Sequence, residues 1–399
     1  MNYFALFGLL LCAMQIKLSI AEQFANDVIY FPHNLDFRGR AYPVPPNLSH
    51  IGSDMCRALL RFNEAKPLGD NGLRWLKIHL SNLFGHNKVS FNDRVVWTES
   101  HMADIVDSAR NPIEGKMWWS TAESPFQALA ACIELANAHE LSDPTTYKCS
   151  LPVHQDGSCN GLQHYAGLGR DELGGKAVNL VPFDTPQDVY SEVLHAVNKR
   201  VALDAERTDR QGHLARLVQP ILSRKIIKQT VMTSVYGVTA IGARMQVLNR
   251  LQEHFAADGL VTPQREAELS EAAAYVAKMT LESLREMFRS AKLIMDWLGL
   301  ISNMIAESGH TMSWITPLGL PVTQPYRRPA RHAVNTVLQR VVLSLNSDFL
   351  PVACRKQRSA FPPNFVHSLD ATHMLLTSLR MKEKGLCFAS VHDSFWTHA

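Results

Sequence analysis

The chain has 399 residues, enough for one large enzyme core or for two or three smaller structural units. With 46% hydrophobic and 19% charged residues, and no low-complexity tract or clear internal repeat, its composition is globular. A net charge of +3 excludes a protein that binds nucleic acid through its overall charge. The seven cysteines are scattered without a C-x-x-C pair, which argues against a disulfide scaffold or a zinc site and favours a reducing compartment.

The N-terminal segment begins with an apolar run, Tyr3–Met14, that has the character of a signal-peptide core. No Lys or Arg precedes the run, and it is too short to span a membrane. Residues 15–24 have helical periodicity and lead into the next motif. We therefore expect a buried helix here and leave residues 1–14 unassigned, either signal-like or an artefact. A secreted protein is the alternative.

Strands are few and far apart, and long helical segments separate them. The expected helices are Met55–Phe62, Pro125–Ala138, one from Asn160, most of residues 186–312, and Asn364–Lys382. The expected strands are Ser150–Val153, Met312–Thr316 and Cys387–His392. This pattern predicts an α+β, mainly helical fold with a small antiparallel sheet rather than a regular βαβ repeat.

Two aspartates follow short apolar strands at a turn. Asp156 is followed by Gly157 and Ser158, and Asp393 comes directly before Ser394. A carboxylate at a strand end can bind a hard cation, and a glycine lets a phosphate approach the backbone. The two aspartates can meet only if both strands lie in one sheet. Each motif alone is also compatible with an ordinary turn.

Basic residues are clustered in two stretches, of which the first, residues 221–250, contains no acidic residue. Within it Arg224, Lys228, Met232 and Tyr236 are spaced four apart, so they share one slowly drifting helical face. Lys228 and Tyr236 are separated by about 12 Å of helix rise, comparable to the length of a nucleotide. Such a helix can hold a triphosphate at one end and a sugar or base at the other. From periodicity alone, an ordinary amphipathic helix with a basic exposed edge is the favoured interpretation.

The second basic stretch, residues 325–360, has seven Lys or Arg against Asp348 alone. In Asp36–Pro43, Arg38 and Arg40 flank a glycine beside aromatic residues, a composition suited to a loop that grips a nucleic-acid backbone. Ordinary loops and solvated helix faces have the same composition.

A fifth segment runs from Phe361 to His373. We expect Asn364 to cap a helix that presents His367, Asp370 and His373 on related faces. Their spacing admits a metal site, and partly buried, hydrogen-bonded polar residues are the competing interpretation.

In this order the five segments resemble the phage-type single-subunit RNA polymerases, above all their mitochondrial members. The residues that carry the resemblance are Asp36-Phe-Arg-Gly-Arg-Ala-Tyr-Pro43, Asp156-Gly-Ser-Cys-Asn-Gly-Leu-Gln-His164, Arg224–Gly237, Pro363-Asn-Phe-Val-His-Ser-Leu-Asp370 and Val391-His-Asp-Ser394. The resemblance extends from about residue 15 to the end of the sequence. It implies DNA-directed RNA polymerase activity and a right-hand fold of palm and fingers with a small antiparallel palm sheet.

The resemblance also implies roles for individual residues. Asp156 and Asp393 would bind two Mg²⁺ ions, with the carbonyl of Gly157 as a further ligand. Lys228 would contact the incoming triphosphate and donate a proton to pyrophosphate, and Arg224 would clamp a phosphate. The 3′-hydroxyl of the RNA would then attack the α-phosphate in an in-line displacement.

Tyr236 and His367 would form the edge that senses the sugar of the nucleotide, and Arg40 would contact the DNA–RNA hybrid. Lys225 falls off the Arg224–Lys228 face, which leaves its role open. A related template-directed DNA polymerase is an alternative that these sugar-sensing residues oppose.

The expected organisation is a first part of the palm with a helical insertion over residues 15–182, fingers over 183–330, and a palm return over 331–399. We expect this last part to be truncated after the second catalytic Asp, so an inactive nucleic-acid-binding remnant is the alternative function. The implied partners are a DNA template, the RNA product, NTPs and mitochondrial transcription factors, with no membrane. The implied location is the mitochondrial matrix.

Overall fold

The computed structural model describes residues 3–256, 263–335, 338–345 and 349–399. Its contacts divide the chain into two compact units. Unit 1 comprises residues 1–157, 184–186 and 371–399, and unit 2 comprises residues 158–183 and 187–370. The boundaries expected for the palm and the fingers stay a prediction.

Unit 1 is built from six helices, short strands and part of a seventh helix, α15. Its helices are α1 (Tyr3–Gln23), α2 (Asp54–Leu59), α3 (Gly69–Leu83), α4 (Phe91–Ser100), α5 (Met102–Arg110) and α6 (Pro125–His139), with 3₁₀ turns at Trp118–Thr121 and Pro144–Thr146. Its strands are β1 (His33–Leu35), β2 (Ala41–Pro43), β3 (Lys66–Pro67), β4 (Lys148–Cys149), β5 (Val153–Asp156), β10 (Ala389–Val391) and β11 (Ser394–Thr397).

The core of unit 1 forms where the apolar faces of α3, α5 and α6 meet. Leu76, Leu80, Ile105 and Leu135 are fully buried there. The expected helix Pro125–Ala138 is confirmed as α6, with a proline in its first turn, where its missing N–H costs no hydrogen bond.

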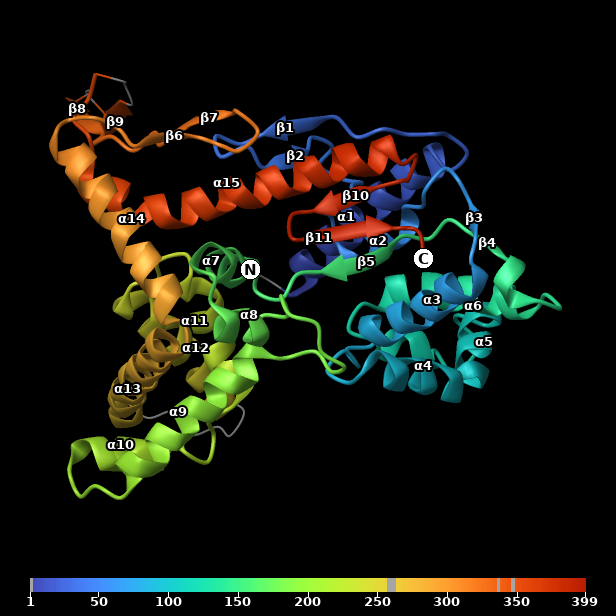
Figure 1. Ribbon diagram of the computed structural model, residues 1–399, viewed down its shortest axis with the longest axis horizontal. Coiled ribbons are helices and arrows are strands. Elements are labelled where there is room, and N and C mark those ends of the chain that lie inside the picture. Colours follow the sequence, from blue (N-terminus) through green and yellow to red (C-terminus); the bar gives the residue numbers. More distant parts are fainter. Residues whose placement is uncertain (1–2, 257–262, 336–337, 346–348) are drawn as a thin grey trace. The chain divides into compact units, whose positions relative to one another are not determined.

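The antiparallel sheet of unit 1 that matters for function has the order β10-β11-β5 (Figure 1). A two-residue turn joins β10 to β11, and β11 pairs with β5, which lies more than 230 residues earlier in the chain. The expected strand at Ser150–Val153 begins at Val153 instead, and the expected final strand Cys387–His392 is shortened to β10 and followed by a further strand.

Unit 2 is mainly helical. Its helices are α7 (Asn160–Gly169), α8 (Glu172–Ala177), α9 (Val189–Ala205), α10 (Arg210–Val218), α11 (Arg224–Ser234), α12 (Ala240–Ala256), α13 (Pro263–Met287), α14 (Arg289–Glu307) and the larger part of α15 (Cys354–Glu383). Two hairpins, β6–β7 (Ser313–Ile315 and Pro321–Thr323) and β8–β9 (Ala330–Asn335 and Arg340–Leu345), complete it. The expected α+β, mainly helical fold with small antiparallel sheets is confirmed.

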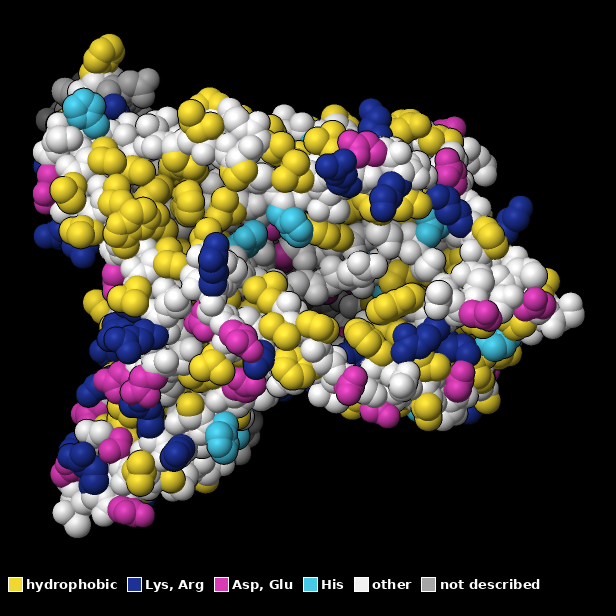
Figure 2. All heavy atoms as spheres, viewed as in Figure 1, with side chains coloured by type: hydrophobic (Ala, Val, Ile, Leu, Met, Phe, Trp, Pro, Cys, Tyr) yellow, Lys and Arg dark blue, Asp and Glu magenta, His cyan; other side chains and the backbone are white. Residues whose placement is uncertain are grey.

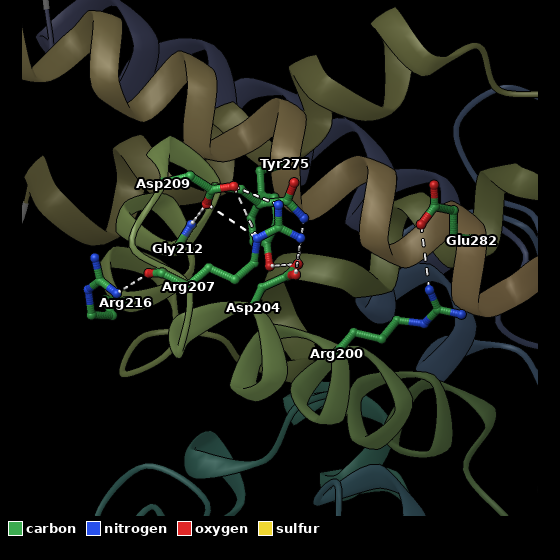
Figure 3. A network of polar contacts seen from close by, with 9 residues as sticks. Arg200, Asp204, Arg207, Asp209, Gly212, Arg216, Tyr275 and Glu282 are labelled. Carbon is green, nitrogen blue, oxygen red and sulfur yellow. Dashed lines mark hydrogen bonds and ion pairs between the residues drawn. The ribbon is translucent and has the colours of Figure 1, made fainter.

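Charged side chains hold α9, α10 and α13 together at one end of unit 2, where basic and acidic groups alternate on the surface (Figure 2). The hydroxyl of Tyr275 on α13 donates to Asp204 on α9, and Arg207 pairs with Asp209 (Figure 3). Asp209 then caps α10 by accepting from the N–H of Gly212 at 3.0 Å. These contacts are partly exposed, so we expect them to contribute to helix docking rather than to most of the stability.

Two expectations about helices are wrong. The described side chains of α1 are exposed or half-exposed, so this helix is not buried within unit 1. Asn364 does not cap a helix, because α15 begins at Cys354 and continues through Pro362 and Pro363. Its path there is supported by Phe361, which is buried in the core of unit 2, and by a hydrogen bond from Tyr165 to the carbonyl of Pro362.

None of the helices in the described ranges combines the length and the apolar character needed to cross a membrane. All seven cysteines are free thiols, as their spacing predicts.

Candidate active site

The register of β5 and β11 brings the two predicted metal-binding aspartates together. Asp156 is the direct cross-strand partner of Ser394, the residue that follows Asp393. The N–H of Gly157 donates to the carbonyl of Asp393 at 2.8 Å, which ties the end of β5 to the β10–β11 turn. The condition set by the sequence, that both strands lie in one sheet, is therefore met.

Asp393 itself has an unusual backbone conformation. Its φ is +51°, a left-handed value that residues with a side chain rarely adopt. The N–H of Ser394 donates to the carbonyl of His392 at 2.6 Å, so Asp393 is the central residue of a γ-turn. Strain of this kind clusters at functional sites, because the surrounding structure must hold it in place.

The donor set at this edge fits magnesium. Asp156, Gly157 and Asp393 are all exposed, and they offer two carboxylates and a backbone carbonyl. Mg²⁺ prefers oxygen ligands and is usually bound by one or two carboxylates together with water and substrate phosphates. Among the described residues no group of three His, Cys, Asp or Glu side chains forms a closed metal cage. An open pair of carboxylates is what a metal shared with a substrate requires.

Stacked histidine and tryptophan side chains support β5 and β11 on one face of the strand pair. His154 on β5 and Trp396 on β11 are cross-strand partners, and their rings stack with centroids 3.8 Å apart at 11°. His79 meets His154 edge-on at 4.9 Å, and His50 lies edge-on to Trp396 at 6.1 Å. Because residues two apart on a strand share one face, this stack lies on the same face as Asp156 and Ser394.

These imidazoles are neutral at physiological pH. Burial lowers the pKa of His50 to about 4, with the neighbouring His33 acting in the same direction. Burial lowers the pKa of His79 to about 3, and His154 beside it adds to the effect. The pKa of His154 is also lowered to about 3 by burial, with a further contribution from Arg57.

The arginine-rich segment Asp36–Pro43 forms the loop and the second strand of the hairpin β1–β2. The carboxylate of Asp36 accepts from the backbone N–H groups of Arg38 and Arg40 and pairs with the guanidinium of Arg38 at 2.6 Å. Burial acts to raise the pKa of Asp36, but the hydrogen bonds and charge of Arg38 and the N–H of Arg40 hold it below its ordinary value. The loop is thus built on an internal ion pair that engages Arg38.

This hairpin lies against the β10–β11 turn. The ring of Tyr42 contacts that of His392 with centroids 4.8 Å apart. His392 directly precedes Asp393, so two of the predicted motifs meet within unit 1. Sequence reasoning did not pair these residues.

In unit 2, helix α11 carries the predicted basic face. Ile226, Ile227, Thr230 and Val231 are buried, whereas Lys228 and Met232 are exposed and Arg224 is half-exposed. The helix closes at Gly237, which has a φ of +77°. The N–H of Gly237 donates to Ser234 and that of Val238 donates to Thr233, which is the Schellman closure. Tyr236 is therefore held at the last turn rather than in the middle of the helix.

The two predicted phosphate-binding cations share one aromatic platform. The guanidinium of Arg224 lies 5.0 Å and the ammonium of Lys228 6.0 Å from the centre of the Tyr190 ring. Arg224 also forms a two-pronged ion pair with Asp188, at 2.8 Å and 3.2 Å. No carboxylate of the described residues pairs with Lys228. A phosphate that binds Arg224 must therefore compete with Asp188, whereas Lys228 meets no such competition.

The predicted sugar-sensing pair is brought together. The rings of Tyr236 and His367 lie with centroids 4.8 Å apart at 40°. Tyr236 lies in the turn that closes α11 and His367 lies on α15, so the two residues are more than 130 positions apart in the sequence.

The contacts of the α15 motif support partly buried, hydrogen-bonded polar residues over a metal site. Asp370 is buried and accepts from the side chain of Asn160 at 2.8 Å, which anchors the first turn of α7. His373 contacts the ring of Phe395 in unit 1 instead of converging with Asp370. The described residues contain no cluster of metal-ligating side chains at this helix.

Comparison with known proteins identifies the family. A family model described as DNA-dependent RNA polymerase matches residues 66–399, most of the chain. The chain belongs to the DNA-dependent RNA polymerase family. The match covers both aspartates and all of α11, so the motifs that suggested the resemblance lie inside it, except for Asp36–Pro43.

Curated relatives of this polymerase family cover nearly the whole chain. The chain is similar to DNA-directed RNA polymerase 1B, mitochondrial, of Nicotiana tabacum, with 52% identity over 394 residues. It is 50% identical over 396 residues to DNA-directed RNA polymerase 1, mitochondrial, of Arabidopsis thaliana, and 50% identical over 394 residues to DNA-directed RNA polymerase 3, chloroplastic, of Nicotiana sylvestris. Each alignment covers 97% of this chain but only 38–40% of the relative.

Sequence reasoning missed several residues that shape this candidate site. Ser394 hydrogen-bonds to the carboxylate of Asp156, and Trp396 supports it. Tyr190 and Asp188 engage the cations of α11. The only sequence signal for the first pair was the two-residue spacing of Ser394 and Trp396, which matches that of His154 and Asp156 on the opposite strand.

Proposed function

We propose that this chain performs template-directed ribonucleotidyl transfer as the catalytic core of a single-subunit DNA-directed RNA polymerase. The observation that carries the proposal is the β5–β11 register, which sets Asp156 beside the turn that holds Asp393, in a chain of this family. The proposed palm comprises residues 15–182 and 331–399, and the proposed fingers residues 183–330.

Asp156 and Asp393, with the carbonyl of Gly157, would hold two Mg²⁺ ions. Bound there, the ions would stabilise the charge on the attacking and leaving oxygens of an in-line displacement. The protein contributes a fixed strand register and a strained turn, so the carboxylates need no rearrangement when substrate arrives.

The side chains of α11 would act on the triphosphate. Lys228 is exposed and would donate a proton to the leaving pyrophosphate. Arg224 would neutralise phosphate charge after exchanging its ion pair with Asp188 for the substrate. Tyr190 would keep both cations on one side of the helix.

Tyr236 and His367 would contact the ribose, and Arg40 would contact the hybrid of template and product. Base pairing with the DNA template would supply sequence specificity, because contacts to phosphate and sugar carry none. The proposed partners are a DNA template, the RNA product, NTPs and mitochondrial transcription factors. We propose a location in the mitochondrial matrix; a plastid location is the alternative that the chloroplastic relatives raise.

Extension of an RNA primer on a DNA template tests the activity. We expect the wild-type chain to extend the primer with NTPs and Mg²⁺, and Asp156→Asn and Asp393→Asn to fall to background. Asp143→Asn is the matched control, since this carboxylate caps a 3₁₀ turn elsewhere in unit 1. Retained extension by either site variant would refute the metal assignment. Template binding without extension by the wild-type chain would favour the inactive binding remnant.

Substrate choice tests the second half of the proposal. Tyr236→Phe removes the hydroxyl from the sugar-sensing pair while keeping the ring contact with His367, so we expect more dNTP incorporation with stability unchanged. Lys228→Ala should slow the chemical step, and Lys225→Ala provides the comparison for loss of a lysine from the same helix. Unchanged discrimination in Tyr236→Phe would remove this residue from sugar selection.

A further inference from the structure

Ser394 connects a buried indole to the carboxylate of Asp156. The Nε1–H of Trp396 donates to Ser394 Oγ at 3.1 Å. Ser394 Oγ in turn hydrogen-bonds to Asp156 Oδ1. All three side chains lie on one face of the β5–β11 pair, because Asp156 and Ser394 are cross-strand partners and Trp396 is two residues farther along β11.

The direction of this hydrogen-bond chain follows from the chemistry of its two ends. An indole N–H can only donate, and an ionised carboxylate can only accept. Ser394 has one hydroxyl proton, so it must accept from Trp396 and donate to Asp156. A donor that itself accepts a hydrogen bond is polarised and donates more strongly.

Trp396, at the far end of these hydrogen bonds, is buried and packed against other side chains. Trp396 is 1% exposed, and its ring stacks on His154 at 3.8 Å. His50 lies edge-on to the same ring, and the guanidinium of Arg57 lies 5.8 Å from its centre. By contrast Asp156, at the other end, is exposed. The hydrogen bonds thus connect a buried, packed group to an exposed carboxylate.

We propose that Trp396 and Ser394 are positioning residues that orient the Asp156 carboxylate for metal binding. The Ser394 hydroxyl occupies Oδ1 of Asp156 from the protein side. The remaining lone pairs of the carboxylate are then directed toward the open edge of the sheet. Residues that hydrogen-bond to a metal ligand set its orientation and affinity in this way. This inference rests on the proposed function, since it assigns a metal to Asp156.

Direct binding of Mn²⁺ as a probe for the magnesium site tests the inference without relying on activity. Free Mn²⁺ is measured by electron paramagnetic resonance during titration of the 399-residue chain. We expect Ser394→Ala to raise the dissociation constant about tenfold. Trp396→Phe keeps an aromatic ring on His154 but removes the donor, and we expect a smaller rise of about threefold.

The double variant gives the decisive comparison. Without the Ser394 hydroxyl the indole has no path to Asp156, so Trp396→Phe should add nothing in a Ser394→Ala background. Independent, additive losses of Mn²⁺ affinity would show that Trp396 acts through general packing, and would overturn the proposed positioning of Asp156 through Ser394. Ser394→Thr, which keeps a hydroxyl, should restore binding to near the wild-type value.

A matched control removes an indole donor elsewhere in unit 1. The Nε1–H of Trp119 donates to the carbonyl of Pro112 at 2.7 Å, and Trp119→Phe should leave Mn²⁺ affinity unchanged. In primer extension, the Ser394→Ala defect should shrink as Mg²⁺ is raised, because a weakened site can still be saturated. A defect that persists at saturating Mg²⁺ would contradict the positioning role.

The outcomes separate this inference from the proposed function. If Asp156→Asn and Asp393→Asn bind Mn²⁺ as the wild type does, the proposed metal site itself is wrong. If those variants lose Mn²⁺ binding while Ser394→Ala keeps it, the proposed metal site is supported and the positioning role of Ser394 and Trp396 is wrong.

Discussion

Under the proposed function, the closure of α11 at Gly237 is expected to control which nucleotide the chain incorporates. Gly237 has a φ of +77°, and a Cβ added there would meet only the carbonyl of Ser359, at 3.4 Å. The cost of Gly237→Ala is therefore in the backbone and not in a clash. A left-handed conformation costs an alanine about 1 kcal/mol relative to glycine, and relief of that cost would unwind the turn that holds Tyr236.

Gly309 is a matched control at the end of α14. It has a φ of +87° with no atom near an added Cβ, and its N–H and that of His310 close the helix with the same hydrogen-bond pattern. Gly309→Ala should lower the free energy of unfolding by the same amount, about 1 kcal/mol. Only Gly237→Ala should also raise dNTP incorporation.

Urea denaturation and primer extension with NTPs or dNTPs measure the two effects. Gly237→Asn should retain much of the wild-type behaviour, because asparagine tolerates the left-handed region. Two results would refute the reasoning. One is a Gly237→Ala protein with wild-type discrimination despite the lost stability. The other is an equal change in discrimination in Gly309→Ala, which would mean that any destabilisation of unit 2 has this effect.

Three further predictions concern stability. The buried imidazoles of His50 and His79 have pKa values below that of an unfolded histidine, so the unfolded chain binds more protons as pH falls below 6.5. Protonation of each imidazole in the unfolded chain should lower the free energy of unfolding by about 2 kcal/mol between pH 7.5 and pH 5. Denaturation at a series of pH values measures this change. A free energy of unfolding that does not vary with pH would contradict the burial of these imidazoles. Gly212→Ala should cost about 2–3 kcal/mol by thermal unfolding, because its Cβ would lie 2.0 Å from the carbonyl oxygen of Arg207. Asp393→Gly should abolish Mn²⁺ binding in the titration described above. It should also raise the free energy of unfolding by up to about 1 kcal/mol, since glycine adopts the φ of +51° without strain.

The sequence predicted the functional segments better than the strands that position them. Asp156 and Asp393 were recognised as carboxylates at strand ends, but β11 is not among the strands that hydrophobic periodicity predicted. That strand has four residues, and its partner β5 lies more than 230 residues away. Hydrophobic periodicity is a local signal, so it cannot reveal a short strand whose stability comes from a distant partner and a buried tryptophan.

The error at α15 has a different physical origin. Two prolines in succession, Pro362 and Pro363, favour a helix start, because proline lacks the N–H that an interior position would use. The helix nevertheless passes through both, with Phe361 in the core and Asn364 bonded to Gln324. Tertiary packing overrode the local preference, which is also why Asn364 serves as a buried partner and not as a cap.

The turns at Gly237 and Asp393 both carry proposed site residues and both require a positive φ, and they meet this requirement in opposite ways. At the end of α11 the proposed chemistry falls on Tyr236, the residue before the turn, so glycine can occupy the left-handed position without loss. In the β10–β11 turn the left-handed position is Asp393 itself. A glycine there would be the more stable choice, yet it would remove the carboxylate that is proposed to bind metal together with Asp156. The retained strain is thus a physical reason, independent of family resemblance, to assign Asp393 to function rather than to folding.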